Sequence, residues 1–186
     1  PEKTAADLAA LIHQSGDHLT TGFVGTPYLL HALSENGYTP LAYTLLLQQT
    51  PPSWLFSVLQ GATTIWEHWD GIKKDGSFWS DDMNSFNHYA YGAVADWMYG
   101  VMAGIGPDEN APGFRHILLR PQPDARIPFV RASIDTKYGR VASEWEIDGS
   151  MVNYKFIVPE GAAAAITLGG ETKEVGSGTY QFSKPL

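Results

Sequence analysis

The chain contains no cysteine among its 186 residues, which excludes disulfides, zinc–thiolate sites and a thiol nucleophile. Basic residues are also few, since 12 lysines and arginines stand against 20 acidic residues and the formal net charge is −8. Without a cluster of lysine and arginine to neutralise phosphates, nucleic acid is not expected as a partner. The absence of cysteine fits reducing and oxidising compartments equally, so it does not locate the protein.

Long apolar runs are missing too, because the sequence has no stretch of about 18 apolar residues. The N-terminus lacks the basic region and apolar core of a signal peptide. We therefore expect no membrane partner and no secretory precursor in the sequence as given. Because the chain starts at Pro-Glu-Lys without an initiator methionine, we expect a piece of a longer protein, with a processed chain as the alternative. What is present, 44% hydrophobic and 12% aromatic residues, is typical of a well-packed globular protein.

Helical patterns dominate the first part of the sequence. Thr-Pro pairs at residues 26–27 and 39–40, and Ser53, are helix start signals, and apolar residues at helical spacing follow each of them. Residues 4–14 show the same spacing. Residues 84–105 predict a longer helix that is apolar nearly all round and therefore buried. Short helices joined by Asn-Gly or Pro-Pro turns indicate helical hairpins.

From about Pro107 the pattern changes to prolines and then to short alternating runs. Asp148-Gly149 between two such runs is a strong hairpin signal. Short strands that recur about every 8–12 residues predict a small antiparallel β-sandwich. The expected strands are residues 130–136, 139–147, 151–158, 164–168, 172–175 and 179–182. We thus expect an α+β multidomain chain, with a helical-hairpin domain over residues 1–110 and an antiparallel β-sandwich domain over residues 111–186.

One stretch of the helical part suggests carbohydrate chemistry. Residues 61–70, Gly-Ala-Thr-Thr-Ile-Trp-Glu-His-Trp-Asp, place Glu67 between Trp66 and Trp69. The C–H faces of a sugar stack on indole rings, while its hydroxyls bond to carboxylates. Glycoside hydrolysis canonically uses two carboxylic acids, and Glu67 is a candidate for one. No second carboxylate stands at a telling spacing, and a glutamate in a loop salt bridge is the alternative interpretation.

A second stretch adds two polar residues to the same hypothesis. Residues 84–92, Asn-Ser-Phe-Asn-His-Tyr-Ala-Tyr-Gly, place Asn87 and His88 in an otherwise apolar helical pattern. Both can bond sugar hydroxyls, although a histidine on an apolar helix is more often a core residue. Trp66 and Trp69 are likewise either stacking platforms or core. The histidines show no HxxxH or HxH spacing, so we expect no metal, and no motif for another cofactor is present.

Several motifs in the same order resemble bacterial α-L-rhamnosidases of glycoside hydrolase family 78. They are residues 18–30 (His-Leu-Thr-Thr-Gly-Phe-Val-Gly-Thr-Pro-Tyr-Leu-Leu), 32–37, 61–70, 83–92 and 104–105. The resemblance runs from about residue 8 to residue 119 and continues more loosely to the end. It implies a catalytic (α/α)6 barrel, of which this chain holds the C-terminal part, followed by a C-terminal β-sandwich.

The resemblance also implies roles for individual residues. Enzymes of the family release terminal L-rhamnose with inversion, so a water must fit between acid and base, with the carboxyls ~6.5–9.5 Å apart. The family's glutamate general base matches Glu67, and the histidine that lines its sugar pocket matches His88. Trp66 and Trp69 are expected to wall the same pocket, with Asn87 beside them.

One part of the family pattern is missing from this sequence. The general acid lies in an earlier segment of the barrel, and the chain encodes too few helices to close such a barrel. We therefore expect the isolated chain to be inactive, and to need the missing N-terminal part of the enzyme or a second copy of itself, as a homodimer, to cover its apolar faces. The alternatives are a non-catalytic carbohydrate-binding or structural module, and another (α/α)6-barrel enzyme acting on sugars, such as a lyase or phosphorylase.

Overall fold

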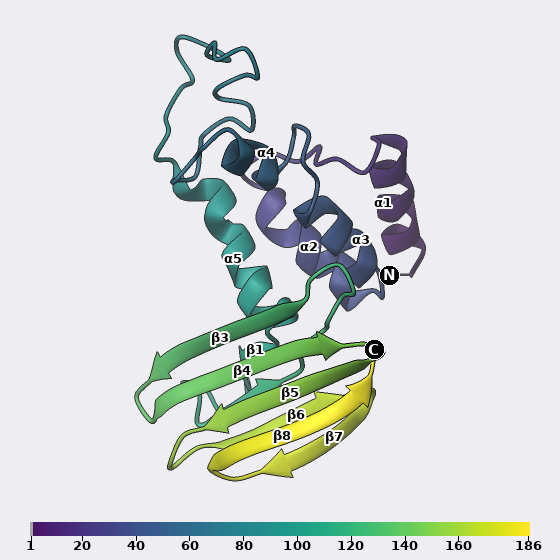
Figure 1. Cartoon of the computed structure of the whole chain (residues 1–186), viewed down its shortest axis with the longest axis vertical. Helices are drawn as coiled ribbons and strands as arrows, with labels where there is room; N and C mark the ends of the chain where they lie inside the picture. Colours follow the sequence, from purple (N-terminus) through teal and green to yellow (C-terminus); the bar gives the residue numbers. More distant parts are fainter. Residues whose placement is uncertain (1) are drawn as a thin grey trace. The chain divides into compact units, whose positions relative to one another are not determined.

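The computed structural model describes residues 2–186, and the chain divides at Ala95–Asp96 into two compact units (Figure 1). The first unit is helical and the second is built of β-strands. Each is a body of its own. The border expected at residues 110/111 falls within the second unit, and its meaning as a domain boundary stays a prediction.

Four α-helices form the first unit: α1 (Glu2–Gln14), α2 (Thr26–Glu35), α3 (Thr39–Leu46) and α4 (Trp54–Leu59). The predicted start signals are confirmed, with one refinement. Thr26 and Thr39 are the first helical residues rather than the caps, and the proline after each occupies the first turn, where a missing N–H costs nothing. Ser53 caps α4, because its Oγ accepts the N–H of Phe56 at 3.2 Å.

The core of this unit comes from the predicted apolar stripes of α1, α2 and α3. Each α2 and α3 leucine that is fully buried stabilises the unit by about 1.5–3 kcal/mol. The buried residues are Ala5, Ala9 and Ile12 on α1, Leu29, Leu30 and Leu33 on α2, and Leu41, Ala42, Tyr43, Leu45 and Leu46 on α3.

The single helix predicted over residues 84–105 is wrong. The helical segment is shorter and irregular, with η1 (Tyr89–Ala93, a 3-10 helix), α5 (Val94–Trp97) and η2 (Met98–Met102, a π-helix). His88 has an extended backbone, with φ −123° and ψ 95°, so Asn87 and His88 precede the helix instead of lying in it. At the other end Gly104 adopts φ +71°, a left-handed conformation that ends a helix.

The second unit consists of two four-stranded sheets, ordered β1-β2-β6-β7 and β3-β4-β5-β8 (Figure 1). All the strands predicted after residue 129 are confirmed; β1 and β2 were not predicted, because they are short and lie among prolines. The bounds are β1 (Ile105–Pro107), β2 (His116–Leu119), β3 (Phe129–Thr136), β4 (Gly139–Asp148), β5 (Met151–Val158), β6 (Ala163–Leu168), β7 (Glu171–Val175) and β8 (Gly178–Pro185).

The expectation of purely antiparallel sheets needs one correction. β2 pairs with β6 in parallel, because the chain builds β3, β4 and β5 of the other sheet before it returns beside β2. The remaining pairs are antiparallel. The hairpin predicted at Asp148–Gly149 is confirmed, with Asp148 opposite Met151 and Gly149 at φ +61°.

The β unit buries side chains between its two sheets, as a sandwich does. Trp145 on β4 is 1% exposed, and its Nε1 donates to the carbonyl oxygen of Met102 at 2.7 Å. Ser143 Oγ donates to the carbonyl oxygen of Ala103 at 2.5 Å. The two bonds satisfy backbone carbonyl groups at the end of η2 and directly after it. The cluster also includes Ile117, Leu119, Val141, Val152, Phe156, Ala164 and Ile166.

Candidate functional site

The two stretches singled out in the sequence lie side by side in the helical unit. The N–H of Glu67 donates to the carbonyl oxygen of Ser85 at 2.9 Å, and the N–H of His88 donates to that of Ile65 at 2.9 Å. These are backbone bonds between segments about twenty residues apart in sequence, running in opposite directions. They bring Glu67 and His88 into one small region of the chain.

Two further features hold the stretches together. Thr64 Oγ1 donates to the carbonyl oxygen of Phe86. Gly92 allows the close approach of Ile65, since a Cβ on Gly92 would lie 3.3 Å from Ile65 Cγ1. The pairing explains why residues 84–88 are not helical, because their backbone forms hydrogen bonds with residues 65–67 instead of along a helix.

Glu67 is half-buried in the loop between α4 and η1, and its carboxylate is oriented by the paired segment around Ser85. Its Oε2 accepts the backbone N–H of Ser85 at 3.2 Å. This bond engages one of the two carboxylate oxygens and restricts the rotation of the side chain. A carboxylate held in this way is suited to accept a proton from a bound water or to bond a sugar hydroxyl.

His88 is half-buried directly before η1, and an aromatic ring that the sequence interpretation did not assign supports it. The rings of His88 and Phe23 stack with centroids 4.9 Å apart and planes 18° apart. Phe23 also contacts Tyr91, at 4.9 Å and 55°. The signal for Phe23 was its place in the Thr-Thr-Gly-Phe-Val-Gly motif. Asn87, beside His88, is exposed.

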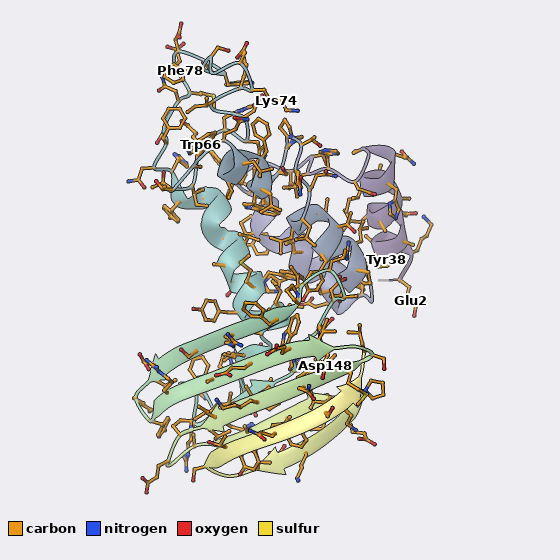
Figure 2. The ribbon with its side chains drawn as sticks, viewed as in Figure 1. Glu2, Tyr38, Trp66, Lys74, Phe78 and Asp148 are labelled. Carbon is orange, nitrogen blue, oxygen red and sulfur yellow. The ribbon has the colours of Figure 1, made fainter. Side chains whose placement is uncertain are left out.

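The tryptophans on either side of Glu67 pack mainly against protein. Trp66, which is labelled in Figure 2, is 6% exposed. It meets Phe86 edge to face at 5.3 Å. Trp69 is 9% exposed and stacks on Tyr91 at 3.7 Å. Both indoles therefore fix the loop that carries Glu67, as part of an aromatic cluster. Their contact with a sugar stays a prediction.

The same cluster ties this loop to α4 and η1. Trp54 on α4 meets Trp69 edge to face at 5.3 Å. Its Nε1 donates to the carbonyl oxygen of Tyr91 at 2.9 Å, a buried bond across 37 positions of sequence. Burial also raises the pKa of the Tyr91 phenol, which keeps it neutral at physiological pH.

A more exposed indole stacks on His68, the residue that follows Glu67. Trp79 is 40% exposed and stacks on the imidazole of His68 at 3.6 Å, with the planes 17° apart. Nδ1 of His68 lies 2.7 Å from Oδ1 of Asp70. The N–H of Trp79 donates to the carbonyl oxygen of Gly71 at 3.0 Å, which closes a short hairpin and sets this stack.

The part of the chain that the structure describes, residues 2–186, contains no group of three or more His, Cys, Asp or Glu side chains arranged to hold a metal ion. Over the same residues, no helix has both the length and the hydropathy needed to cross a membrane.

Two family models match the chain, one for each of its two kinds of structure. Residues 1–102 match the bacterial alpha-L-rhamnosidase 6 hairpin glycosidase domain, and residues 104–183 match the bacterial alpha-L-rhamnosidase C-terminal domain. The helical-hairpin and β-sheet architecture implied by the resemblance is thereby confirmed.

Individual proteins agree with the family models. An alpha-L-rhamnosidase of Streptomyces avermitilis is 39% identical over 97% of this chain and 19% of its own length, and one of Formosa agariphila is 41% identical over 93% and 18%. The crystal structure of the Streptomyces avermitilis enzyme complexed with L-rhamnose matches 97% of this chain and 19% of that chain, with a TM-score of 0.90 and 38% identity. The crystal structure of the native alpha-L-rhamnosidase from Aspergillus terreus matches 98% of this chain and 21% of that chain, with a TM-score of 0.93 and 35% identity.

The chain spans about a fifth of the length of the curated relatives it matches. The first family model nevertheless covers more than half of this chain, and the two models together cover nearly all of it. The paired loops with Glu67 and His88 lie inside the first matched region. The chain belongs to the bacterial α-L-rhamnosidase family.

Proposed function

We propose that this chain is part of an α-L-rhamnosidase that hydrolyses terminal α-L-rhamnose from glycosides or oligosaccharides. The observation that carries the proposal is the placement of Glu67, whose Oε2 is fixed by the backbone N–H of Ser85 while the backbone of the same loop pairs beside His88. Family membership supplies the substrate class. One oriented carboxylate next to an imidazole and several aromatic rings is an arrangement suited to a sugar.

In this proposal Glu67 is the general base of an inverting reaction. It takes a proton from a water that attacks the anomeric carbon on the face opposite the leaving group, while a carboxylic acid ~6.5–9.5 Å away protonates the glycosidic oxygen. His88 and Asn87 bond the sugar hydroxyls. Trp66 and Trp69 hold the base loop and wall the pocket, and Phe23 supports the ring of His88.

The general acid belongs, in this proposal, to a part of the enzyme outside these 186 residues. Without it the leaving oxygen is not protonated, so the purified chain alone hydrolyses no rhamnoside. Incubation of the chain with an aryl α-L-rhamnoside tests this directly. Turnover above the buffer rate would contradict the placement of the acid elsewhere.

The helical unit exposes large apolar side chains that point to further partners. They include Leu11 at 59%, Val24 at 86%, Tyr28 at 72%, Leu59 at 64% and Tyr89 at 88% exposure. Apolar surface of this kind favours association. We expect the remaining hairpins of the same enzyme to cover it, or a second copy of the chain when those are absent. A chain that stays monomeric in light scattering and binds no hydrophobic dye would contradict this.

The experiment that tests the proposal compares Glu67→Gln with wild type in the full-length enzyme that contains this chain. NMR of the first product should show inverted L-rhamnose from wild type. Glu67→Gln should lose about 10²–10⁴-fold in kcat while still binding rhamnose, because the amide cannot accept the proton. Glu35→Gln, a surface change at the end of α2, is the matched control and should leave kcat unchanged.

The same comparison separates the proposal from its alternatives. A carbohydrate-binding module would bind sugar with no turnover in either form. Another (α/α)6-barrel enzyme would turn over a different glycoside and leave aryl α-L-rhamnoside intact. Normal turnover of rhamnoside by Glu67→Gln would leave the family assignment in place and remove Glu67 from the mechanism.

A further inference from the structure

The β unit has an open hollow of about 510 Å³ at one end of its two sheets. Its lining comes from the loop between β1 and β2, the turn between β3 and β4, and the first residue of β6. The polar and aromatic groups that line it are Asn110, Arg115, His116, Lys137 and Tyr138. All lie within the β unit and apart in sequence from Glu67.

Two cations of the hollow have no carboxylate partner. Arg115 and Lys137 are exposed, and neither forms an ion pair with any carboxylate among residues 2–186. The ammonium of Lys137 instead lies 4.9 Å from the centroid of the Tyr138 ring. Five cations of the same unit that do not line the hollow are paired, namely Arg126 with Asp124, Arg131 with Glu146, Arg140 with Asp135, Lys155 with Glu144 and Lys184 with Glu171.

A histidine contacts two carboxylates beside the hollow. His116 Nδ1 lies 2.9 Å from Oδ2 of Asp108, and its Nε2 lies 2.9 Å from Oε2 of Glu174. Both acids are thus engaged by the imidazole instead of by Arg115 or Lys137. Acidic side chains in the adjoining turns, at Glu109 and Glu160, are exposed and are not part of the lining. The residues that line the hollow thus include Arg115 and Lys137 and no carboxylate, in a protein whose formal net charge is −8.

The backbone that carries the two cations is held in place. Phe114, just before Arg115, adopts the left-handed φ of +62°, which costs energy for a residue other than glycine, and its ring packs against the sandwich core. In the β3–β4 turn, Oγ1 of Thr136 accepts the N–H of Tyr138 at 3.1 Å, across Lys137. A strained residue and a side-chain-closed turn hold the backbone at the two cations in defined conformations before any ligand binds.

We propose that this hollow binds the anionic group of an acidic saccharide, either the carboxylate of a uronic acid or a sulfate ester. The guanidinium of Arg115 matches the two oxygens of such a group in a bidentate contact, and Lys137 adds a second positive charge. The amide of Asn110 is available for a sugar hydroxyl. The saccharide part of the proposal rests on the proposed function, whereas the anion-binding part rests only on the hollow.

The test measures binding by calorimetry at low salt, where surface charge is least screened. The probes are a galacturonic acid trisaccharide, a sulfated oligosaccharide, a neutral trisaccharide of equal length and inorganic sulfate. The variant Arg115→Ala/Lys137→Ala is compared with wild type. Its matched control is Arg131→Ala/Lys155→Ala, which removes the same charge from paired residues on the outer face of β3 and β5. All four positions are exposed or half-buried, and circular dichroism checks that both variants fold.

We expect at least one acidic saccharide to bind, with affinity reduced about tenfold or more in Arg115→Ala/Lys137→Ala and unchanged within about twofold in the control. Preference for the uronate or for the sulfate ester identifies which anion the hollow takes. Equal losses in both variants would mean non-specific charge attraction and would overturn the proposal. Equal affinity for inorganic sulfate would overturn the saccharide part, and no binding of any anionic probe would overturn the whole; neither result bears on Glu67.

Discussion

His116 on β2 and Glu174 on β7 are joined across a strand that lies between them. Nε2 of His116 lies 2.9 Å from Oε2 of Glu174, although the sheet order places β6 between β2 and β7. β6 sets Ala163 beside His116 and Ala165 beside Glu174. Because both residues of β6 are alanines, the longer side chains meet over them. With Asp108 on its other nitrogen, the imidazole links three parts of one sheet.

This link predicts a pH-dependent contribution to the stability of the β unit. The hydrogen bond to Glu174 raises the pKa of His116, the bond to Asp108 adds to the rise, and burial opposes it. Since the folded pKa lies above the ordinary value of about 6.5, the stabilisation is fully present below pH 6.5 and is lost as pH rises through the folded pKa. Asn110 and His116 lower the pKa of Asp108, so its share is lost only in acid, as pH falls below about 3.9.

The variant His116→Gln tests the prediction. Chemical denaturation at pH 5.5 and at pH 9 should show a larger loss of unfolding free energy, relative to wild type, at pH 5.5. Asp135→Asn, which breaks the exposed pair with Arg140, is the control and should show no such difference between the two pH values. An equal deficit of His116→Gln at both pH values would contradict the link.

Gly104 provides a prediction about the backbone after η2. It adopts φ +71°, and a Cβ there would lie 2.1 Å from the backbone nitrogen of Pro121. Gly104→Ala should therefore destabilise the protein by more than about 3 kcal/mol, through conformational strain and a clash that backbone atoms cannot relieve. Thermal and denaturant unfolding measure the loss.

Gly106, two residues after Gly104 and within β1, is the matched control. A Cβ there meets nothing within 4 Å, and its φ is not in the left-handed region. Gly106→Ala should change stability by less than about 0.5 kcal/mol. Similar losses for both variants would mean that the conformation at Gly104 is not a constraint.

Phe23 provides a prediction about the site. Its ring stacks on His88, so Phe23→Leu should allow the imidazole to move and should lower kcat/KM of the full-length enzyme about tenfold. Phe23→Tyr keeps an aromatic ring and should retain most of the activity. Glu35→Gln, a change at an exposed polar residue at the end of α2, is the control. Equal kcat/KM for Phe23→Leu and wild type would remove Phe23 from the site.

The success of the sequence interpretation depended on local signals. Strands such as β5 and the Asp148–Gly149 hairpin follow from alternation and turn chemistry, and α2 and α4 follow from Thr-Pro and Ser start signals. β1 and β2 were not predicted, because a strand of three or four residues has too few alternating positions to be recognised in the sequence. The parallel register of β2 with β6 depends on residues more than forty positions apart.

The candidate site likewise combines features that local motifs predicted with contacts that only the fold reveals. The motifs predicted that the stretches around Glu67 and His88 act together, and the backbone bonds from Glu67 to Ser85 and from His88 to Ile65 bring them side by side. The helical spacing of apolar residues nevertheless placed His88 within a helix. Residues that pair with a distant segment, as His88 does with Ile65, can carry an apolar pattern that looks helical. Phe23 could not be paired with His88 from spacing, since 65 positions separate them and only the fold brings their rings together.

The most direct test of Glu67 as the base is chemical rescue of Glu67→Ala by azide in the full-length enzyme. Azide needs no deprotonation, so it replaces both the base and the water. We predict that wild type releases inverted rhamnose, that Glu67→Ala loses most of its rate on an aryl α-L-rhamnoside, and that azide restores turnover and yields the β-L-rhamnosyl azide. Near-normal hydrolysis by Glu67→Ala, or a rhamnosyl azide of retained configuration, would contradict the account.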